Sequence, residues 1–290
     1  RRVNVSFRPI TWKLRTRSLT TEDHTLVMGV VNTTPDSFSD GGRWIEPAEA
    51  IRHGLRLWGD GADIVDVGGE STRPGAEPVG TDDEIDRVIP VVEALATHGI
   101  VVSIYTTTPQ VAEAAIGAGA DIVNDVTGLT DPEMMALCAT TRVGAVIMHM
   151  QGEPRTMQVD PTYDDVVAEV GQYLDDRTAA AVASGIDPAG IVVDPGIGFG
   201  KTFEHNLALL AGIDRFGGDR PVLIGTSRKR FLATILDRAG RVSDPEDRDS
   251  ATLATVALAI AGGASIVRVH NVAGAADAAR TADAIVRVHE

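Results

Sequence analysis

Polar side chains that could bind a ligand recur along the chain, each near the end of a short apolar segment. Asn124 and Asp194 lie at the ends of two such segments, and Lys229 follows a third. A carboxylate pairs with adjacent N–H donors, and amide and ammonium groups serve the neighbouring acceptors. Together these residues predict a site that holds a flat, amide-rich heterocycle by its edge.

A second group of side chains suits an anion. Arg73 follows the second apolar segment, whereas Arg268 and His270 belong to the last one. Guanidinium groups match phosphate oxygens in geometry and charge, so we expect these residues to bind a diphosphate or a similar anion. Asn32 ends the first segment and offers an amide oxygen, a suitable ligand for Mg2+ whose other ligands are water and phosphate oxygens.

Eight apolar segments alternate with helical patterns, and these elements must position the polar side chains. The expected strands are residues 26–32, 63–69, 101–106, 121–126, 144–150, 191–196, 221–226 and 265–270. The expected helices are residues 47–60, 81–98, 108–118, 131–140, 163–184, 202–216, 229–236 with 249–261, and 272–289. Strands that are apolar throughout are typical of parallel sheets covered by helices. Eight such units predict an α/β fold, a single (β/α)8 TIM barrel over residues 26–290, with an open doubly wound sheet as the alternative.

A short phrase recurs before three of the expected strands. It reads Gly-Ala-Asp at residues 61–63 and 119–121, and Gly-Ala-Ser at residues 263–265. Glycine at such a place ends a helix in a left-handed turn, so we expect the same helix-to-strand corner three times.

In a barrel of this kind the chemistry lies where strands end and the following loops begin. All the polar residues above fall there, which predicts that they converge on one mouth. Asp66, Asp125 and His149 fall at the same end of their strands. For each of these three, a role in the site and a role as a satisfied buried polar group remain open. The long loops after the first two strands are expected to close over the substrate.

Composition excludes several classes of protein. The net charge of −15 argues against nucleic acid or an anionic membrane as a partner, and no apolar segment is long enough to span a membrane. The single cysteine, Cys138, cannot form an intramolecular disulfide, which suits the cytoplasm, and we expect it to be a core residue rather than a nucleophile. Residues 1–25 carry six arginines and lysines and are expected to form a solvated N-terminal extension, with an arm that guides association as the alternative.

Residues 196–202 resemble a nucleotide-binding loop, but Pro195 stands where that motif requires its first glycine, so we expect no ATP site. The sequence has no cluster of cysteine and histidine for zinc.

Five segments resemble the dihydropteroate synthases. They are GVVNTTPDSFSDGG at residues 29–42, VGGESTRPGA at 67–76, DPGIGFGK at 194–201, GTSRKR at 225–230 and RVH at 268–270. The resemblance extends from residue 26 to the C-terminus. It implies a synthase that joins 6-hydroxymethyl-7,8-dihydropterin diphosphate to para-aminobenzoate, releasing diphosphate and giving 7,8-dihydropteroate for folate synthesis. Members of this family are usually homodimers.

The resemblance also implies which residues form each part of the site. The pterin pocket would comprise Thr72, Asn124, Asp194 and Lys229. Diphosphate and Mg2+ would contact Asn32, Arg73, Arg268 and His270. Para-aminobenzoate, and in this family the sulfonamides, would lie near Phe38, Arg73, Pro74, Phe199, Ser227 and Lys229. The expected catalytic residues are Arg73, Lys229, Arg268 and His270.

The chain departs from this family at Tyr105, near the end of the third strand, where the family has an aspartate that accepts hydrogen bonds from the pterin. A tyrosine is neutral and far larger, and the loss of a carboxylate partner for buried N–H groups costs on the order of 1–3 kcal/mol. Three interpretations remain open: an active synthase, a paralogue that serves as a pterin-binding or regulatory module, and a different pterin enzyme on the same scaffold.

Overall fold

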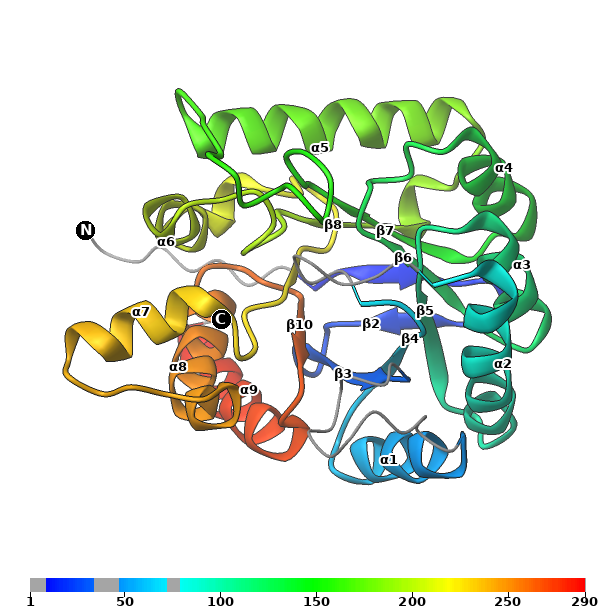
Figure 1. The fold of residues 1–290 in the computed structure, drawn as a ribbon, viewed down its shortest axis with the longest axis horizontal. Coiled ribbons are helices and arrows are strands. Elements are labelled where there is room, and N and C mark those ends of the chain that lie inside the picture. Colours follow the sequence, from blue (N-terminus) through cyan, green and yellow to red (C-terminus); the bar gives the residue numbers. More distant parts are fainter. Residues whose placement is uncertain (1–8, 34–46, 72–78, 290) are drawn as a thin grey trace.

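A ring of parallel strands surrounded by helices forms the body of the molecule (Figure 1). The structure is a computed structural model that describes residues 9–33, 47–71 and 79–289. The barrel strands are β3 (Leu26–Asn32), β4 (Ile64–Gly68), β5 (Val101–Tyr105), β6 (Ile122–Asp125), β7 (Gly144–Met148), β8 (Ile191–Asp194), β9 (Leu223–Ile224) and β10 (Ile266–Val269). They pair in the order β8-β7-β6-β5-β4-β3-β10-β9, and a parallel bridge between Val193 and Val222 closes the ring. The fold is therefore the expected (β/α)8 barrel and not an open sheet.

Helices follow the strands and cover the outside of the barrel. They are α1 (Pro47–Gly59), α2 (Thr81–Thr97), α3 (Pro109–Gly117), α4 (Pro132–Thr141), α5 (Val166–Ala183), α6 (Phe203–Ala211), α7 (Arg230–Arg238), α8 (Asp249–Ala261) and α9 (Val272–Val286), with short turns η2 (Pro188–Gly190), η3 (Ile213–Arg215), η4 (Pro245–Arg248) and η5 (Arg287–His289). Local sequence explains several starts: the side chains of Asp131, Asp165 and Thr202 cap α4, α5 and α6. None of the helices in the described ranges is long and apolar enough to cross a membrane.

Two apolar layers hold the barrel together. Alternate strand residues fill its interior, whereas the residues between them pack outward against the helices. The interior layer comprises Leu26, Met28, Ile64, Val101, Ile122, Val146, Val192, Leu223 and Ile266. Burial on both faces explains why the strand segments read as nearly continuous apolar runs. Cys138 lies in the outer layer, fully buried, and burial raises the pKa of its thiol to about 12, so it is a core residue as expected.

The three repeated corners have the expected backbone. Gly61, Gly119 and Gly263 adopt positive φ angles of 105°, 113° and 100°. A side chain at these φ values would be strained, so glycine is the residue that lets each helix turn directly into the next strand.

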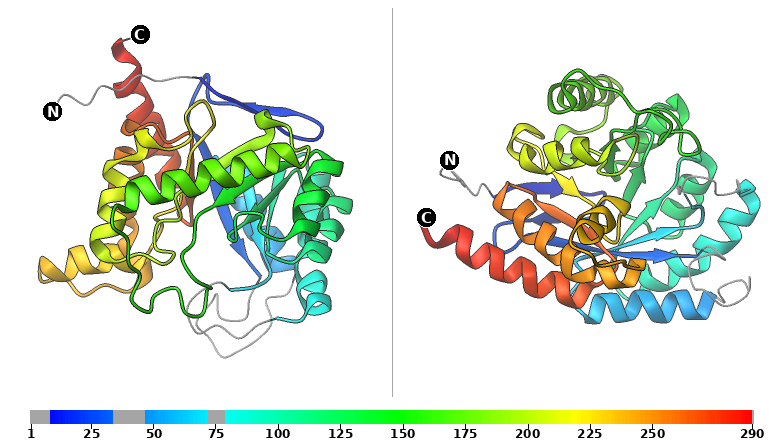
Figure 2. Two further views of the ribbon diagram at one scale, coloured as in Figure 1. Left: turned by 90° about the horizontal axis from the view of Figure 1, so that it is seen from above. Right: turned by 60° about the vertical axis from the view of Figure 1, so that its left-hand side comes forward.

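Residues 9–25 pack against the barrel, which contradicts, for this described part, the expectation that residues 1–25 form a solvated extension. Strands β1 (Thr11–Lys13) and β2 (Ser18–Thr20) form an antiparallel hairpin across the N-terminal end of the barrel (Figure 2). Trp12 and Leu14 are only 1% and 3% exposed and join the interior layer. The indole Nε1 of Trp12 donates to the Gly190 carbonyl at 2.9 Å. The described part of this segment therefore closes the N-terminal end of the barrel.

Candidate active site

The strand register brings the predicted polar residues to one level at the C-terminal mouth. Asn32 pairs with Gly68, Gly68 with Tyr105, and Tyr105 with Asn124, so four consecutive strands end in one row. Asp194 ends β8. The parallel arrangement therefore converts residues that are far apart in sequence into neighbours, as the strand pattern predicts.

Asp66 is the centre of a buried polar cluster just inside this mouth. Its Oδ2 accepts hydrogen bonds from Arg268 Nε at 2.6 Å and from Asn124 Nδ2 at 3.1 Å. Burial disfavours the charge of Arg268, but the nearby carboxylates of Asp66 and Asp194 outweigh it and raise the pKa of the guanidinium. Asp66 therefore orients two residues that were predicted to bind substrate.

Tyr105 lies against the same arginine. The guanidinium carbon of Arg268 is 4.7 Å from the centre of the Tyr105 ring, which is cation–π geometry. The ring also covers Gly68, where an added Cβ would come within 3.3 Å of it. Tyr105 thus extends from β5 over the end of β4 and contacts Arg268 of β10.

Asp194 and Lys229 form the charged part of the mouth next to the loop after β8. Oδ1 of Asp194 accepts from the Gly196 backbone N–H at 2.7 Å, and burial raises the pKa of the carboxyl. The ammonium of Lys229 donates to the Ile197 carbonyl and lies 4.8 Å from the centre of the Phe199 ring. Burial, assisted by Arg268 and opposed by Asp194, lowers the pKa of Lys229 to about 8.

Ser227 and His270 link the last two strands. The Ser227 hydroxyl accepts from the His270 backbone N–H at 3.1 Å and lies 2.9 Å from Nδ1 of the same imidazole. This double contact places both side chains on the β9–β10 side of the mouth, beside Lys229.

His149 serves the structure of the mouth. Its Nδ1 is 2.9 Å from Nζ of the buried Lys201, which also donates to the Phe199 carbonyl at 2.8 Å. Burial, together with the charge of Lys201, lowers the pKa of His149 to about 3, so the imidazole is neutral. Burial likewise lowers the pKa of Lys201 to about 7. No sequence pattern singles out Lys201 beyond its place in the motif at residues 194–201.

Asp125 is also a satisfied buried group. Its carboxylate accepts from the backbone N–H of Thr127 at 2.8 Å and of Leu129 at 3.2 Å. These bonds shape the loop after β6.

Several predicted residues lie outside the described ranges: Phe38, Thr72, Arg73 and Pro74. Asn32 is described and is half-buried at the end of β3. Among the residues that the structure describes, no group of three or more histidine, cysteine, aspartate and glutamate side chains could hold a metal ion.

Comparison with known proteins agrees with this arrangement. The family described as pterin binding enzyme matches residues 28–270. A dihydropteroate synthase from Mycobacterium leprae is 48% identical over 263 residues, which cover 89% of this chain and 92% of that protein. The dihydropteroate synthase of Yersinia pestis, solved with a sulfonamide drug, superposes with a TM-score of 0.89 at 37% identity, covering 95% and 99% of the two chains. That of Xanthomonas albilineans, solved with 4-aminobenzoic acid, gives 0.88 at 43%, covering 97% and 100%. The chain therefore belongs to the pterin-binding enzymes and, within them, to the dihydropteroate synthases.

Proposed function

We propose that this mouth joins 6-hydroxymethyl-7,8-dihydropterin diphosphate to para-aminobenzoate and releases diphosphate. The observation that carries this assignment is the convergence of Asn124, Asp194, Lys229, Arg268 and His270 on one end of the barrel. The positions of these side chains support a separate part of the reaction on each side of that mouth.

The pterin edge would lie against β6 and β8. One N–H of the Asn124 amide donates to Asp66, so its other N–H and its carbonyl oxygen are left for the ligand. Asp194 uses one oxygen for the Gly196 N–H, and its other oxygen can accept from the ring N–H groups. Lys229 can donate to a ring carbonyl or nitrogen.

The diphosphate would lie on the opposite side, against Arg268 and His270, with Arg73 as the third contact implied by the family. Cationic groups that are already oriented stabilise the charge on a leaving group without reorganisation during the reaction, and Asp66 orients Arg268 for that role. Asn32 fits Mg2+ as a single neutral oxygen ligand, with water and diphosphate oxygens as the rest of the shell. Bound there, the ion would add charge stabilisation for the diphosphate.

Para-aminobenzoate would occupy the space between Phe199, Ser227 and Lys229, with Pro74 contributing from the second loop. The 4-aminobenzoic acid and sulfonamide complexes of the two related enzymes support such a subsite. We infer that sulfonamides compete for it here. The neutral amine of the substrate is itself the nucleophile, so the reaction needs positioning more than a strong base.

Tyr105 favours an alternative function, in which the chain binds a pterin without catalysing its conversion. Its ring occupies the strand end next to Asn124 and stacks on Arg268. In the family an aspartate is expected at this place, so the ring both removes an acceptor and fills part of the mouth.

A homodimer in the cytoplasm stays a prediction from the family and from the single cysteine. Apolar side chains on adjacent helices support the dimer, because Leu207 of α6, Ile235 of α7 and Leu258 of α8 are 39%, 39% and 71% exposed. Sedimentation equilibrium at micromolar concentration would distinguish the dimer from a monomer.

Calorimetric titration with the pterin diphosphate and Mg2+, followed by addition of para-aminobenzoate, tests the proposal. Binding followed by dihydropteroate formation is the expected result. Binding without product would favour the pterin-binding module, and the absence of binding would contradict both.

A further inference from the structure

Arg228 has an unusual backbone conformation between two residues of the candidate site. Its φ angle is +60°, in the left-handed region that is costly for residues with a side chain. Ser227 precedes it and Lys229 follows it, and both side chains enter the mouth. Strain at such a position persists only where surrounding contacts impose it.

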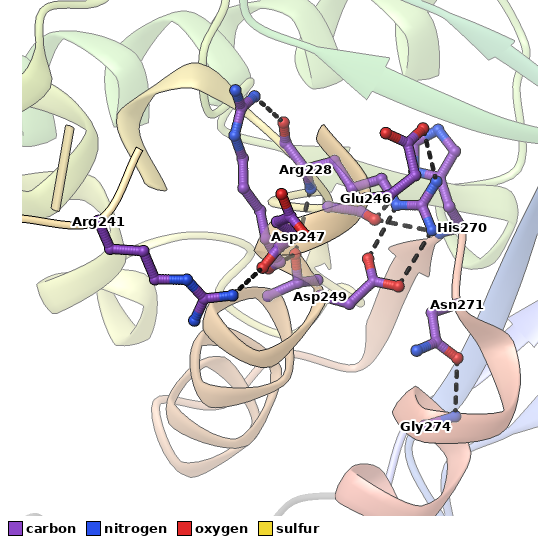
Figure 3. A network of polar contacts seen from close by, with 11 residues as sticks. Arg228, Arg241, Glu246, Asp247, Asp249, His270, Asn271 and Gly274 are labelled. Atoms are coloured by element: carbon purple, nitrogen blue, oxygen red, sulfur yellow. Dashed lines mark hydrogen bonds and ion pairs between the residues drawn. The ribbon is translucent and has the colours of Figure 1, made fainter. Parts of the chain in front are cut away.

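Those contacts come from η4 and the start of α8. The guanidinium of Arg228 makes a two-pronged ion pair with Asp249, at 2.8 Å from Nε and 3.0 Å from Nη2. Glu246 adds a longer contact of 3.7 Å to Nη1. Figure 3 shows the Asp249 carboxylate facing this guanidinium, with His270 on the neighbouring segment.

The backbone of Arg228 is held as firmly as its side chain. Its N–H donates to Thr252 Oγ1 at 3.1 Å, and its carbonyl accepts from Arg248 Nη1 at 3.0 Å. Arg248 is itself fixed by the Ser243 carbonyl at 2.8 Å. Donor, acceptor and guanidinium of one residue are thus each occupied, which is more than an ordinary surface loop requires.

We propose that Arg228 is a positioning residue: its clamp to Asp249, Arg248 and Thr252 imposes the left-handed turn that directs Ser227 and Lys229 into the mouth. A right-handed backbone at residue 228 would redirect the two flanking side chains together. The consequence would fall on both substrates, because Ser227 lies on the aminobenzoate side and Lys229 contacts both sides. The kinetic part of this inference rests on the proposed function.

Three substitutions distinguish the effect of the backbone conformation of residue 228 from the effect of its charge. Arg228→Ala removes the ion pair to Asp249 but keeps both backbone hydrogen bonds and the cost of the left-handed turn, so we expect kcat/KM for para-aminobenzoate to fall by at least about tenfold. Arg228→Gly removes the same ion pair but adopts positive φ freely, so its loss should be smaller. Asp249→Asn keeps Arg228 and weakens the ion pair, and should fall between wild type and Arg228→Ala. Arg220→Ala, which breaks a 2.8 Å ion pair to Asp175 away from the mouth, is the matched control and should keep wild-type kinetics.

A second measurement does not depend on turnover. The chain contains three lysines, Lys13, Lys201 and Lys229, so NMR of isotope-labelled lysine gives few signals to assign. Lys229 is surrounded by Asp194, Arg268, Lys201 and the Phe199 ring, and burial lowers its pKa to about 8. If the Lys229 side chain leaves the mouth in the Arg228→Ala variant, the pKa of Lys229 should rise by about one unit or more toward the value in water. Arg220→Ala should leave it unchanged.

The two readouts distinguish the failure of this inference from the failure of the proposed function. A wild-type chain that makes no dihydropteroate contradicts the proposed function, whereas the lysine titration still tests Arg228. A folded Arg228→Ala variant with unchanged Lys229 pKa overturns the inference. So does an Arg228→Gly variant that loses as much activity as Arg228→Ala, because the backbone conformation would then not be what the clamp provides.

Discussion

The two ends of this barrel are built from the same strands but differ in how their buried polar groups are hydrogen-bonded. At the N-terminal end, Asp63 accepts from Val27 N–H at 2.8 Å and pairs with His24, and Asp283 accepts from the Thr25 N–H and hydroxyl. At the C-terminal mouth, Asp66 Oδ1 and Ser103 Oγ are buried without a hydrogen-bond partner among the described residues. At the N-terminal end these carboxylates find their hydrogen-bond partners within the chain. At the C-terminal mouth these two oxygens have none among the described residues.

This difference separates stability from function. Buried polar groups without partners and lysines with lowered pKa cost folding free energy, and such groups are typical of functional sites. The buried apolar side chains of the hairpin at the other end contribute to stability. A cavity of about 370 Å³ does lie at that end, lined in part by His24, Asp63 and Arg280, but none of the residues predicted for the substrates lines it. Substitutions at the two ends should therefore give different phenotypes.

The largest expected effect is on stability, from Trp12→Ala. The indole is 1% exposed and fills the bottom of the barrel, so its removal should lower the free energy of unfolding by about 3–5 kcal/mol. Chemical denaturation measures this change. Below the melting temperature kcat/KM should stay within about twofold of wild type, because a bottom residue does not act on the transition state. Trp58→Ala, at a side chain that is 50% exposed, is the control. A stably folded Trp12→Ala variant without activity would contradict the assignment of stability and activity to opposite ends of the barrel.

Sequence patterns predicted the barrel well because its strands are buried on both faces. β3 has the expected boundaries, and the other strands differ from theirs by at most two residues at either end. β9 shows the largest difference: it is confined to Leu223–Ile224 although residues 221–226 were expected. The positive φ of Gly61, Gly119 and Gly263 was predictable because glycine leaves a local signature.

The hairpin at the N-terminal end was missed because its signal is short. Ile10, Trp12 and Leu14 alternate with polar residues, the pattern of a strand with one buried face, but six basic residues dominate the composition of that segment. Its cations instead meet acidic groups at the barrel bottom, such as Lys13 with Asp187 at 2.7 Å. Likewise no pattern predicted that Asp66 would hold Arg268, because that contact joins residues of strands that are not adjacent.

Arg268→Ala should show the opposite phenotype to Trp12→Ala. Loss of one oriented cation at a developing charge typically costs about 10²–10³-fold in rate, so turnover of the diphosphate substrate should be nearly abolished. Binding of a pterin that lacks the diphosphate should remain mostly intact in calorimetry. Equal loss of both would contradict the assignment of Arg268 to the diphosphate. Arg238→Ala, at an arginine that is 63% exposed, controls for charge alone.

Lysine burial at the mouth should appear as a pH dependence of stability. Lys201 has a native pKa of about 7 against 10.5 in its ordinary state, so the unfolded chain binds more protons between these values. The free energy of unfolding should therefore rise with pH across this window, by up to about 1.4 kcal/mol per pH unit from this group. Urea denaturation at pH 7, 8 and 9 should show a smaller slope for Lys201→Met. Identical slopes would mean that the native pKa of Lys201 is not lowered.

Tyr105→Asp tests the departure from the family within the mouth. The new carboxylate would lie beside Asn124 and accept from the pterin, and the ring would no longer cover Gly68. We expect kcat/KM to rise by at least about tenfold, equivalent to roughly 1.4 kcal/mol in the barrier. Tyr105→Phe keeps the ring and should change little. An unchanged or lower rate in Tyr105→Asp would show that Tyr105 does not limit this enzyme.

The smallest effect should come from Lys13→Ala at the opposite end. The Lys13–Asp187 pair is short, but the two side chains are 60% and 43% exposed, so its loss should cost about 0.2–1 kcal/mol and less at high salt. The hydrogen bond from Lys13 lowers the pKa of Asp187 below its ordinary value of 3.8. That contribution is present above the ordinary pKa and is lost as pH falls through the lowered one, so wild type and variant should converge in acid. Denaturation in urea at pH 7 and at pH 3 measures both. A loss at pH 7 comparable to that of Trp12→Ala would mean that ion pairs, and not the buried indole, hold the hairpin against the barrel.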